Sequence, residues 1–152
     1  MQCAVVEFAR NVLNLNGASS TEIENSPLHP VIDIMEEQKN IKTMGGTMRL
    51  GAYTCLLEQD SLANKVYEQH EISERHRHRY EFNNDYLSRF KEAGMIASGI
   101  NKETGLVEIM ELKNHPWFIA TQFHPELKST VINPHPLFVA FVDAALEHKK
   151  NQ

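Results

Sequence analysis

A short apolar run near the end of the chain, Trp117–Phe123, constrains the fold most strongly. Its aromatic and branched side chains are typical of a buried β-strand. Two further strands are expected before it, at 95–101 and 106–112, joined by the turn sequence Lys-Glu-Thr-Gly. The residues at 135–150 predict a final amphipathic helix, whose basic end suits the helix dipole. This combination of strands and helices predicts one α/β domain.

The first part of the chain is expected to add further helices and strands. Residues 2–13 carry an apolar stripe at helical spacing, and Asn16-Gly17 ends the pattern. No start signal precedes this helix, which indicates an element cut off from its left neighbour. Residues 17–30 read as a loop because they are rich in Ser, Asn and Pro. The other expected elements are a strand at 30–35, a glycine turn and strand at 45–57, a short helix at 62–68 and a helix at 85–94.

Composition and charge narrow the class of protein. Of the 152 residues, 41% are hydrophobic and 23% are charged, which is typical of a globular domain. A net charge of −5 argues against a general nucleic-acid partner. Neither a membrane-spanning run nor a secretory signal is visible, so no membrane association is expected. Two cysteines do not make a disulfide framework, and a cytoplasmic location is expected.

Two candidate catalytic residues, His124 and Glu126, directly follow the strand at 117–123. In extended backbone, residues i and i+2 point to the same side, and Pro125 disfavours a helix at His124. Glu126 can then accept a hydrogen bond from one imidazole nitrogen while the other nitrogen serves as a base toward a nucleophile. The same pattern also fits a solvated strand end, and spacing alone leaves both interpretations open.

No convincing nucleophile accompanies this pair. Cys3 lies inside the opening helix, without the sharp turn that an activated cysteine needs. Cys55 lies in an apolar run. Both are therefore expected to be small buried hydrophobic residues.

A basic stretch at 74–81 offers another kind of site. His76 and His78 could bind a metal as a pair, but no third ligand stands at suitable spacing, so no metal site is expected. Its arginines suit a carboxylate or a phosphate, and the alternative is an exposed strand with a solvated basic face. Arg75, Arg77 and Arg79 occupy alternate positions of the expected strand, so their side chains would point to the same side. A selective role for Arg79 therefore requires either a turn or bulge between His78 and Arg79 or a cleft that reaches only the last of the three arginines.

Five stretches together resemble one family, the CTP synthases. They are MQCAVVEFARNVL (1–13), GGTMRLGAY (45–53), RHRHRYEFNN (75–84), NHPWFIATQFHPE (114–126) and PHPLFVAFVDAA (134–145). RHRHRYEFNN and GGTMRLG are the most specific, whereas FHPE is shared by many class I amidotransferases. The resemblance covers nearly the whole chain and implies an α/β fold, the C-terminal portion of a flavodoxin-like class I glutamine amidotransferase domain. Residues 1–152 would be a partial domain, with the synthetase domain and the first part of the amidotransferase domain absent.

The resemblance also implies a function. CTP synthases convert UTP to CTP with ATP, using ammonia that a cysteinyl thioester mechanism cuts from glutamine. The nucleophile is expected three positions before Met1, because Met-Gln ends the family motif Gly-Ile-Cys-Leu-Gly-Met-Gln. The chain alone is therefore expected to be inactive and to hold no cofactor, while the parent enzyme uses ATP and magnesium and is activated by GTP. Glutamine is the expected small-molecule partner, and the parent is expected to be a homotetramer.

Site residues carry over by motif. His124 matches the general base and Glu126 its orienting partner. Gln2, Glu22 and Arg79 match glutamine-binding positions, and the pairing is chemically sound because an acidic residue suits the substrate ammonium and an arginine its carboxylate.

A sixth residue and two alternatives complete the expectations. Arg49 matches the lid segment linked to GTP activation. The first alternative is a separately encoded, non-catalytic remnant that docks on a partner. The second is a class I glutamine amidotransferase of another pathway.

Overall fold

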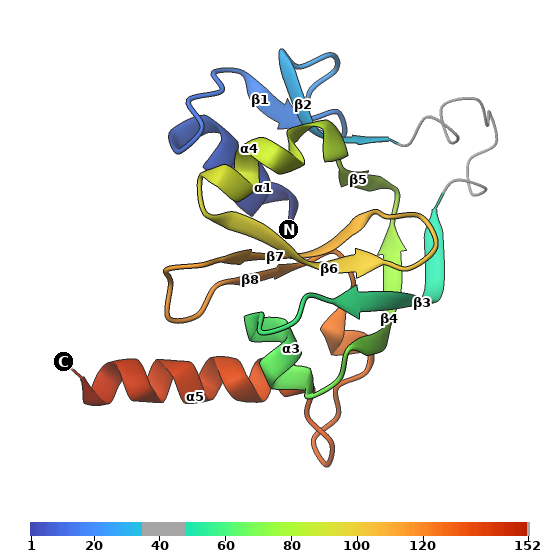
Figure 1. The fold of residues 1–152 in the computed structure, drawn as a ribbon. Helices are drawn as coiled ribbons and strands as arrows, with labels where there is room; N and C mark the ends of the chain where they lie inside the picture. The colour runs from blue at the N-terminus through green and yellow to red at the C-terminus, as the bar shows by residue number, and fades with distance from the viewer. Residues whose placement is uncertain (35–47, 152) are drawn as a thin grey trace.

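Two β-sheets organise the part of the chain that the structure describes, residues 1–34 and 48–151 of a computed structural model (Figure 1). A three-stranded sheet has the strand order β1-β2-β5, and a five-stranded sheet has the order β4-β3-β6-β7-β8. Two predicted features, a strand end at Met35 and a glycine turn at 45–47, lie outside the described residues.

Single strands, hairpins and helices are interspersed along the described chain. The strands are β1 (Ala18–Ser20), β2 (His29–Ile34), β3 (Arg49–Leu57), β4 (Glu71–His78), β5 (Tyr80–Phe82), β6 (Met95–Asn101), β7 (Val107–Leu112) and β8 (Ile119–Thr121). The helices are α1 (Gln2–Asn11), α3 (Leu62–Tyr67), α4 (Leu87–Glu92) and α5 (Pro136–Lys150), with single 3-10 turns η1 (Asn84–Tyr86) and η2 (Pro125–Leu127).

Helix α1 packs on the three-stranded sheet. Val5 and Phe8 are buried at the predicted helical spacing, and they join a core that includes Ile32 of β2 and Phe82 of β5. β1 runs parallel to β2, and β2 runs antiparallel to β5. The predicted opening helix is confirmed, and α1 is slightly shorter than expected.

The five-stranded sheet is antiparallel at every pairing and separates two cores. β7 is buried along most of its length. Val107 and Met110 belong to the core with α1 and α4, whereas Ile109 belongs to the core with α3 and α5. The two strands predicted at 95–101 and 106–112 are confirmed as β6 and β7.

A single residue, Arg79, connects the two sheets between β4 and β5. His78 is paired with Arg49 in the five-stranded sheet, and Tyr80 is paired with Ile34 in the three-stranded sheet. Arg79 forms a bend between them and belongs to neither ladder. Of the two arrangements that would distinguish Arg79 from Arg75 and Arg77, the structure has the turn in the backbone.

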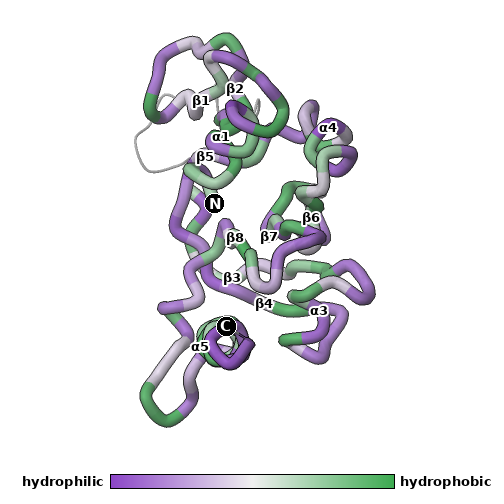
Figure 2. Tube along the Cα trace, turned by 90° about the vertical axis from the view of Figure 1, so that its left-hand side faces the viewer, coloured by the Kyte–Doolittle hydropathy of each residue, from purple (hydrophilic) through white to green (hydrophobic). Residues whose placement is uncertain are grey.

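The final helix, α5, lies against the five-stranded sheet only at its start. Leu137 enters the core with α3, whereas Phe141 and Val142 are more than half exposed. Figure 2 shows α5 end-on below the sheet, with the C-terminus toward the viewer. The predicted helix is confirmed. Among the described helices, none combines the length and the apolar character that crossing a membrane requires.

Two predicted boundaries need correction. The segment 17–30, expected as a loop, contains β1 and the start of β2, because its backbone pairs in a parallel ladder that a Ser- and Pro-rich composition does not predict. The strand predicted at 117–123 is limited to Ile119–Thr121. Phe123 leaves the ladder because it turns into the core beside α3 and α5.

Candidate functional site

A pocket of about 630 Å³ lies where the two sheets meet. Its walls come from the start of α1, the turn after β1, the β4–β5 bend and the segment after β8. The lining residues are Met1, Gln2, Glu22, Met48, Arg77, His78, Arg79, Tyr80, Thr121, Gln122, Phe123, His124, Pro125 and Glu126. The fold thus gathers five of the six predicted site residues, namely Gln2, Glu22, Arg79, His124 and Glu126.

His124 and Glu126 form the predicted pair. Nδ1 of His124 lies 2.7 Å from Oε1 of Glu126, and the His124 backbone N–H donates to the carbonyl oxygen of Arg75 at 2.9 Å. Burial opposes ionisation of Glu126, but the hydrogen bond from His124, a backbone hydrogen bond and the charge interaction with His124 together outweigh it and lower the pKa of this carboxyl. An ionised Glu126 accepts a hydrogen bond from Nδ1–H of His124. The proton of the neutral imidazole then stays on Nδ1, so Nε2 keeps its lone pair and can act as a base.

Gln2 and Glu22 line the same pocket and are in contact with each other. Nε2 of Gln2 donates to Oε2 of Glu22 at 2.6 Å. Gln2 stands in the first turn of α1, and Glu22 stands in the turn that follows β1. The two side chains offer a carboxylate and an amide to a polar ligand.

Arg79 is the cationic group of the pocket whose surroundings best suit a ligand. Arg75 and Arg77 are exposed on β4, whereas Arg79 is partly buried at the bend. Its Nε is buried and has no hydrogen-bond partner among the described residues. A buried unpaired donor is costly, so an acceptor from a ligand would be favourable at this position.

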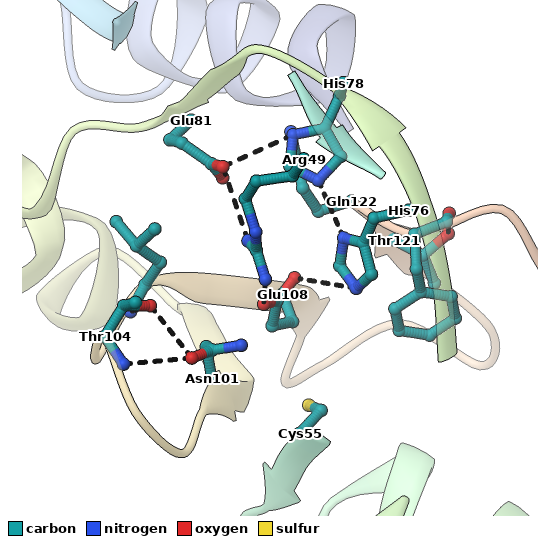
Figure 3. Close-up of polar contacts among 12 residues, drawn as sticks. Arg49, Cys55, His76, His78, Glu81, Asn101, Thr104, Glu108, Thr121 and Gln122 are labelled. Carbon is teal, nitrogen blue, oxygen red and sulfur yellow. Dashed lines mark hydrogen bonds and ion pairs between the residues drawn. The ribbon is translucent and has the colours of Figure 1, made fainter. Parts of the chain in front are cut away.

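Arg49 lies outside the pocket lining, in a buried ion-pair network (Figure 3). Its guanidinium lies 2.8 Å from Oε1 of Glu108 and 3.3 Å from Oε1 of Glu81, and it stacks over the ring of Tyr53 at 4.4 Å. Arg49 is 7% exposed. Burial raises the pKa of Glu108 and raises that of Glu81 to about 8.

His76 and His78 border the same network. Nδ1 of His76 lies 2.7 Å from Nε2 of His78, and burial lowers the pKa of these imidazoles to about 3 and about 4, respectively. Both rings are therefore neutral near pH 7.

The fold brings these two histidines to a third possible metal ligand, Glu108 of β7, which sequence spacing did not reveal. One ligand atom from each residue lies within 4.8 Å of the others. However, Glu108 is ion-paired with Arg49, and the two imidazoles are hydrogen-bonded to each other. The group fits an internal network better than a cation site, because Arg49 already supplies the positive charge.

The two cysteines differ in their surroundings. Cys55 is buried as predicted, and burial raises the pKa of its thiol to about 12. The expectation that Cys3 is buried is wrong, because Cys3 lies on the face of α1 turned away from Val5 and Phe8 and is exposed. Neither thiol lines the pocket that contains His124.

Comparison with known proteins identifies the family. The profile of the family Glutamine amidotransferase class-I matches residues 1–144. The chain belongs to the class-I glutamine amidotransferase family. Its α/β fold is that of the class-I amidotransferase domain, as predicted, since it matches the solved structure "Trypanosoma brucei CTPS - glutaminase domain with bound acivicin" with a TM-score of 0.88 and 37% identity. That match covers 97% of this chain and 57% of the other.

Several curated relatives of this amidotransferase sequence are CTP synthases. It is 60% identical to CTP synthase of Christiangramia forsetii over 152 residues and 61% identical to that of Bacteroides thetaiotaomicron over 151 residues. CTP synthase of Caldanaerobacter subterraneus is 56% identical over 151 residues. The matches cover 99 to 100% of this chain and 28% of each relative, so the chain matches a part of CTP synthase.

One pocket residue of this amidotransferase was not singled out from the sequence. Gln122 precedes His124 by two positions, so the parity argument that linked His124 to Glu126 also applies to it. Its side chain contacts residues of β4 and β5, and those contacts are visible only in the fold.

Proposed function

We propose that this chain is the part of a CTP synthase amidotransferase domain that binds L-glutamine and supplies the base and the orienting acid of its hydrolysis. In the complete enzyme, the released ammonia converts UTP to CTP in the cytoplasm with ATP and magnesium, under activation by GTP through the segment that contains Arg49. The complete enzyme is a homotetramer that includes the synthetase domain.

Substrate placement follows from charge. The α-carboxylate of L-glutamine pairs with the guanidinium of Arg79, whose buried Nε needs an acceptor. The α-ammonium pairs with Glu22, which Gln2 holds through the 2.6 Å hydrogen bond. The side-chain amide then extends toward His124, which lines the same pocket.

Proton transfer is the role of His124. Nε2 removes the proton from the nucleophilic thiol, while Glu126 at Nδ1 stabilises the imidazolium that results. His124 then returns the proton to the departing nitrogen, which leaves as ammonia. Cys3 and Cys55 do not line the pocket, so the thiol is expected from the complete domain.

The convergence of five predicted residues from separate segments on one pocket carries this proposal. The first test measures L-glutamine binding to the chain by calorimetry, with D-glutamine as the control. Absence of binding would favour the alternative of a non-catalytic remnant that docks on a partner.

The second test uses a complete CTP synthase that contains this sequence. His124→Ala should reduce glutamine-dependent CTP formation by several orders of magnitude and leave ammonia-dependent formation nearly intact, because free ammonia bypasses amide cleavage. Comparable losses with both nitrogen sources would show that His124 has a structural role.

A further inference from the structure

The side-chain amide of Gln122 contacts both neighbours of Arg79. Its Nε2 lies 2.7 Å from the carbonyl oxygen of Tyr80 and 2.9 Å from Nδ1 of His78. Gln122 is 7% exposed, and its backbone N–H donates to the carbonyl oxygen of Glu108 at 2.8 Å. This amide is therefore a fixed donor group in the lining of the pocket.

Arg79 has little else to fix its direction. It belongs to neither strand ladder, and its Nε has no hydrogen-bond partner among the described residues. The residues on both sides of it are held by a single NH₂ group, which arises from the segment that also carries His124. The amide thus links the backbone around the arginine to the backbone around the base.

We propose that Gln122 is a positioning residue that holds Arg79 toward the carboxylate of the substrate. This inference rests on the proposed function of the pocket, and it adds a role for a residue that does not itself need to touch L-glutamine.

The same amide dictates where protons lie in the adjacent network (Figure 3). The carbonyl oxygen of Tyr80 can only accept a hydrogen bond, so the Gln122 group that faces it must be the NH₂ group. The same NH₂ group also faces Nδ1 of His78. Nδ1 of His78 is then the acceptor, and its Nε2–H donates to Nδ1 of His76 at 2.7 Å. His76 in turn carries its proton on Nε2, which faces Oε2 of Glu108 at 3.5 Å.

Because Gln122 determines which ring nitrogens of His76 and His78 carry protons, its placement can be measured without any substrate. Both imidazoles should be neutral Nε2–H tautomers in the wild-type chain. Long-range ¹H–¹⁵N correlation spectra distinguish Nε2–H from Nδ1–H imidazoles, and they report on Gln122 through the two histidines.

The decisive variant is Gln122→Glu, measured at pH 9, above the pKa of about 8 that burial gives the neighbouring Glu81; its carboxylate keeps the shape of the side chain and removes both donated hydrogens. We expect the Kd for L-glutamine to rise about tenfold and His78 to change to the Nδ1–H tautomer, because the carboxylate can only accept. Gln122→Met serves as a second variant that adds no buried charge and should give a similar loss of affinity. Gln69→Glu, on an exposed residue, is the control for net charge and should alter neither reading.

A double-mutant comparison separates positioning from general damage. If Gln122 acts through Arg79, Gln122→Met should cause no further loss of affinity when Arg79 is already alanine. Additive losses, or unchanged affinity in both Gln122 variants, would overturn the positioning role. Failure of the wild-type chain to bind L-glutamine would instead refute the proposed function, and the tautomers would still show whether the amide is placed as described.

Discussion

Replacement of Glu81 by glutamine should change how the stability of the protein depends on pH. Glu81 is 2% exposed, and Arg49 lies 3.3 Å from its Oε1, yet burial raises its pKa from 4.5 to about 8. The folded protein therefore holds a proton on Glu81 that the unfolded chain releases above pH 4.5. Because the folded state binds more protons, this residue reduces stability as pH rises from about 4.5 to about 8.

The magnitude follows from the shift. Each pH unit within the window is worth about 1.4 kcal/mol per proton. Between pH 5 and pH 8, Glu81 should thus remove roughly 3 kcal/mol from the free energy of unfolding. Glu81→Gln keeps an oxygen for the Arg49 guanidinium and cannot ionise. The free energy of unfolding of the variant, relative to that of the wild type, should therefore rise by roughly 3 kcal/mol between pH 5 and pH 8.

Urea denaturation at pH 5, 6, 7 and 8 measures this difference directly. Glu147→Gln, on the exposed part of α5, is the control for the loss of one negative charge. Titrating groups distant from Glu81 cancel because both proteins carry them. A constant offset between variant and wild type, or a growing advantage of the wild type with rising pH, would refute the assignment of a buried proton to Glu81.

Two further changes test the pocket and the sheet. Arg79→Ala should weaken L-glutamine binding by about ten- to a hundredfold in calorimetry, because a charge-assisted pair is lost, and an equal loss in Arg77→Ala would show that only the summed charge matters. Gly99→Ala should lower the free energy of unfolding by about 1 to 3 kcal/mol in urea, because the added Cβ would lie 2.6 Å from Cγ1 of Ile109 and 2.8 Å from Sγ of Cys55. An unchanged denaturation midpoint would contradict the tight contact at Gly99.

Local spacing was sufficient for the elements with strong patterns. The apolar stripe of the opening helix and the strands that became β6 and β7 depend on residues a few positions apart. Spacing left the His124–Glu126 pair as one of two interpretations, and the structure places the two side chains within hydrogen-bond distance. The alternation of the three arginines left a bend near Arg79 as one of two possibilities, and the bend is present. Gln2 and Glu22 were placed by resemblance, and the structure brings them to the same pocket as His124.

Long-range pairing determines what spacing did not reveal. Arg49 looks like a lone arginine beside glycines, and its buried partners Glu81 and Glu108 come from β5 and β7. The same pairing makes Glu108 a neighbour of His76. The strand β1 was missed because three residues without an alternating pattern become a strand only through their neighbour β2.

The chain crosses from one sheet to the other at Arg79, next to the pocket, so a bound substrate can affect the stability of the contact between the two sheets. Gln2 and Glu22 stand beside the three-stranded sheet, whereas His124 and Glu126 stand beside the five-stranded one. An amino acid bound in this pocket would contact side chains from both sheets and so help to hold the two sheets together. At a hundred times its Kd, such a ligand adds about 2.7 kcal/mol to the stability of the folded state. Part of the cohesion between the layers would then vary with the supply of glutamine.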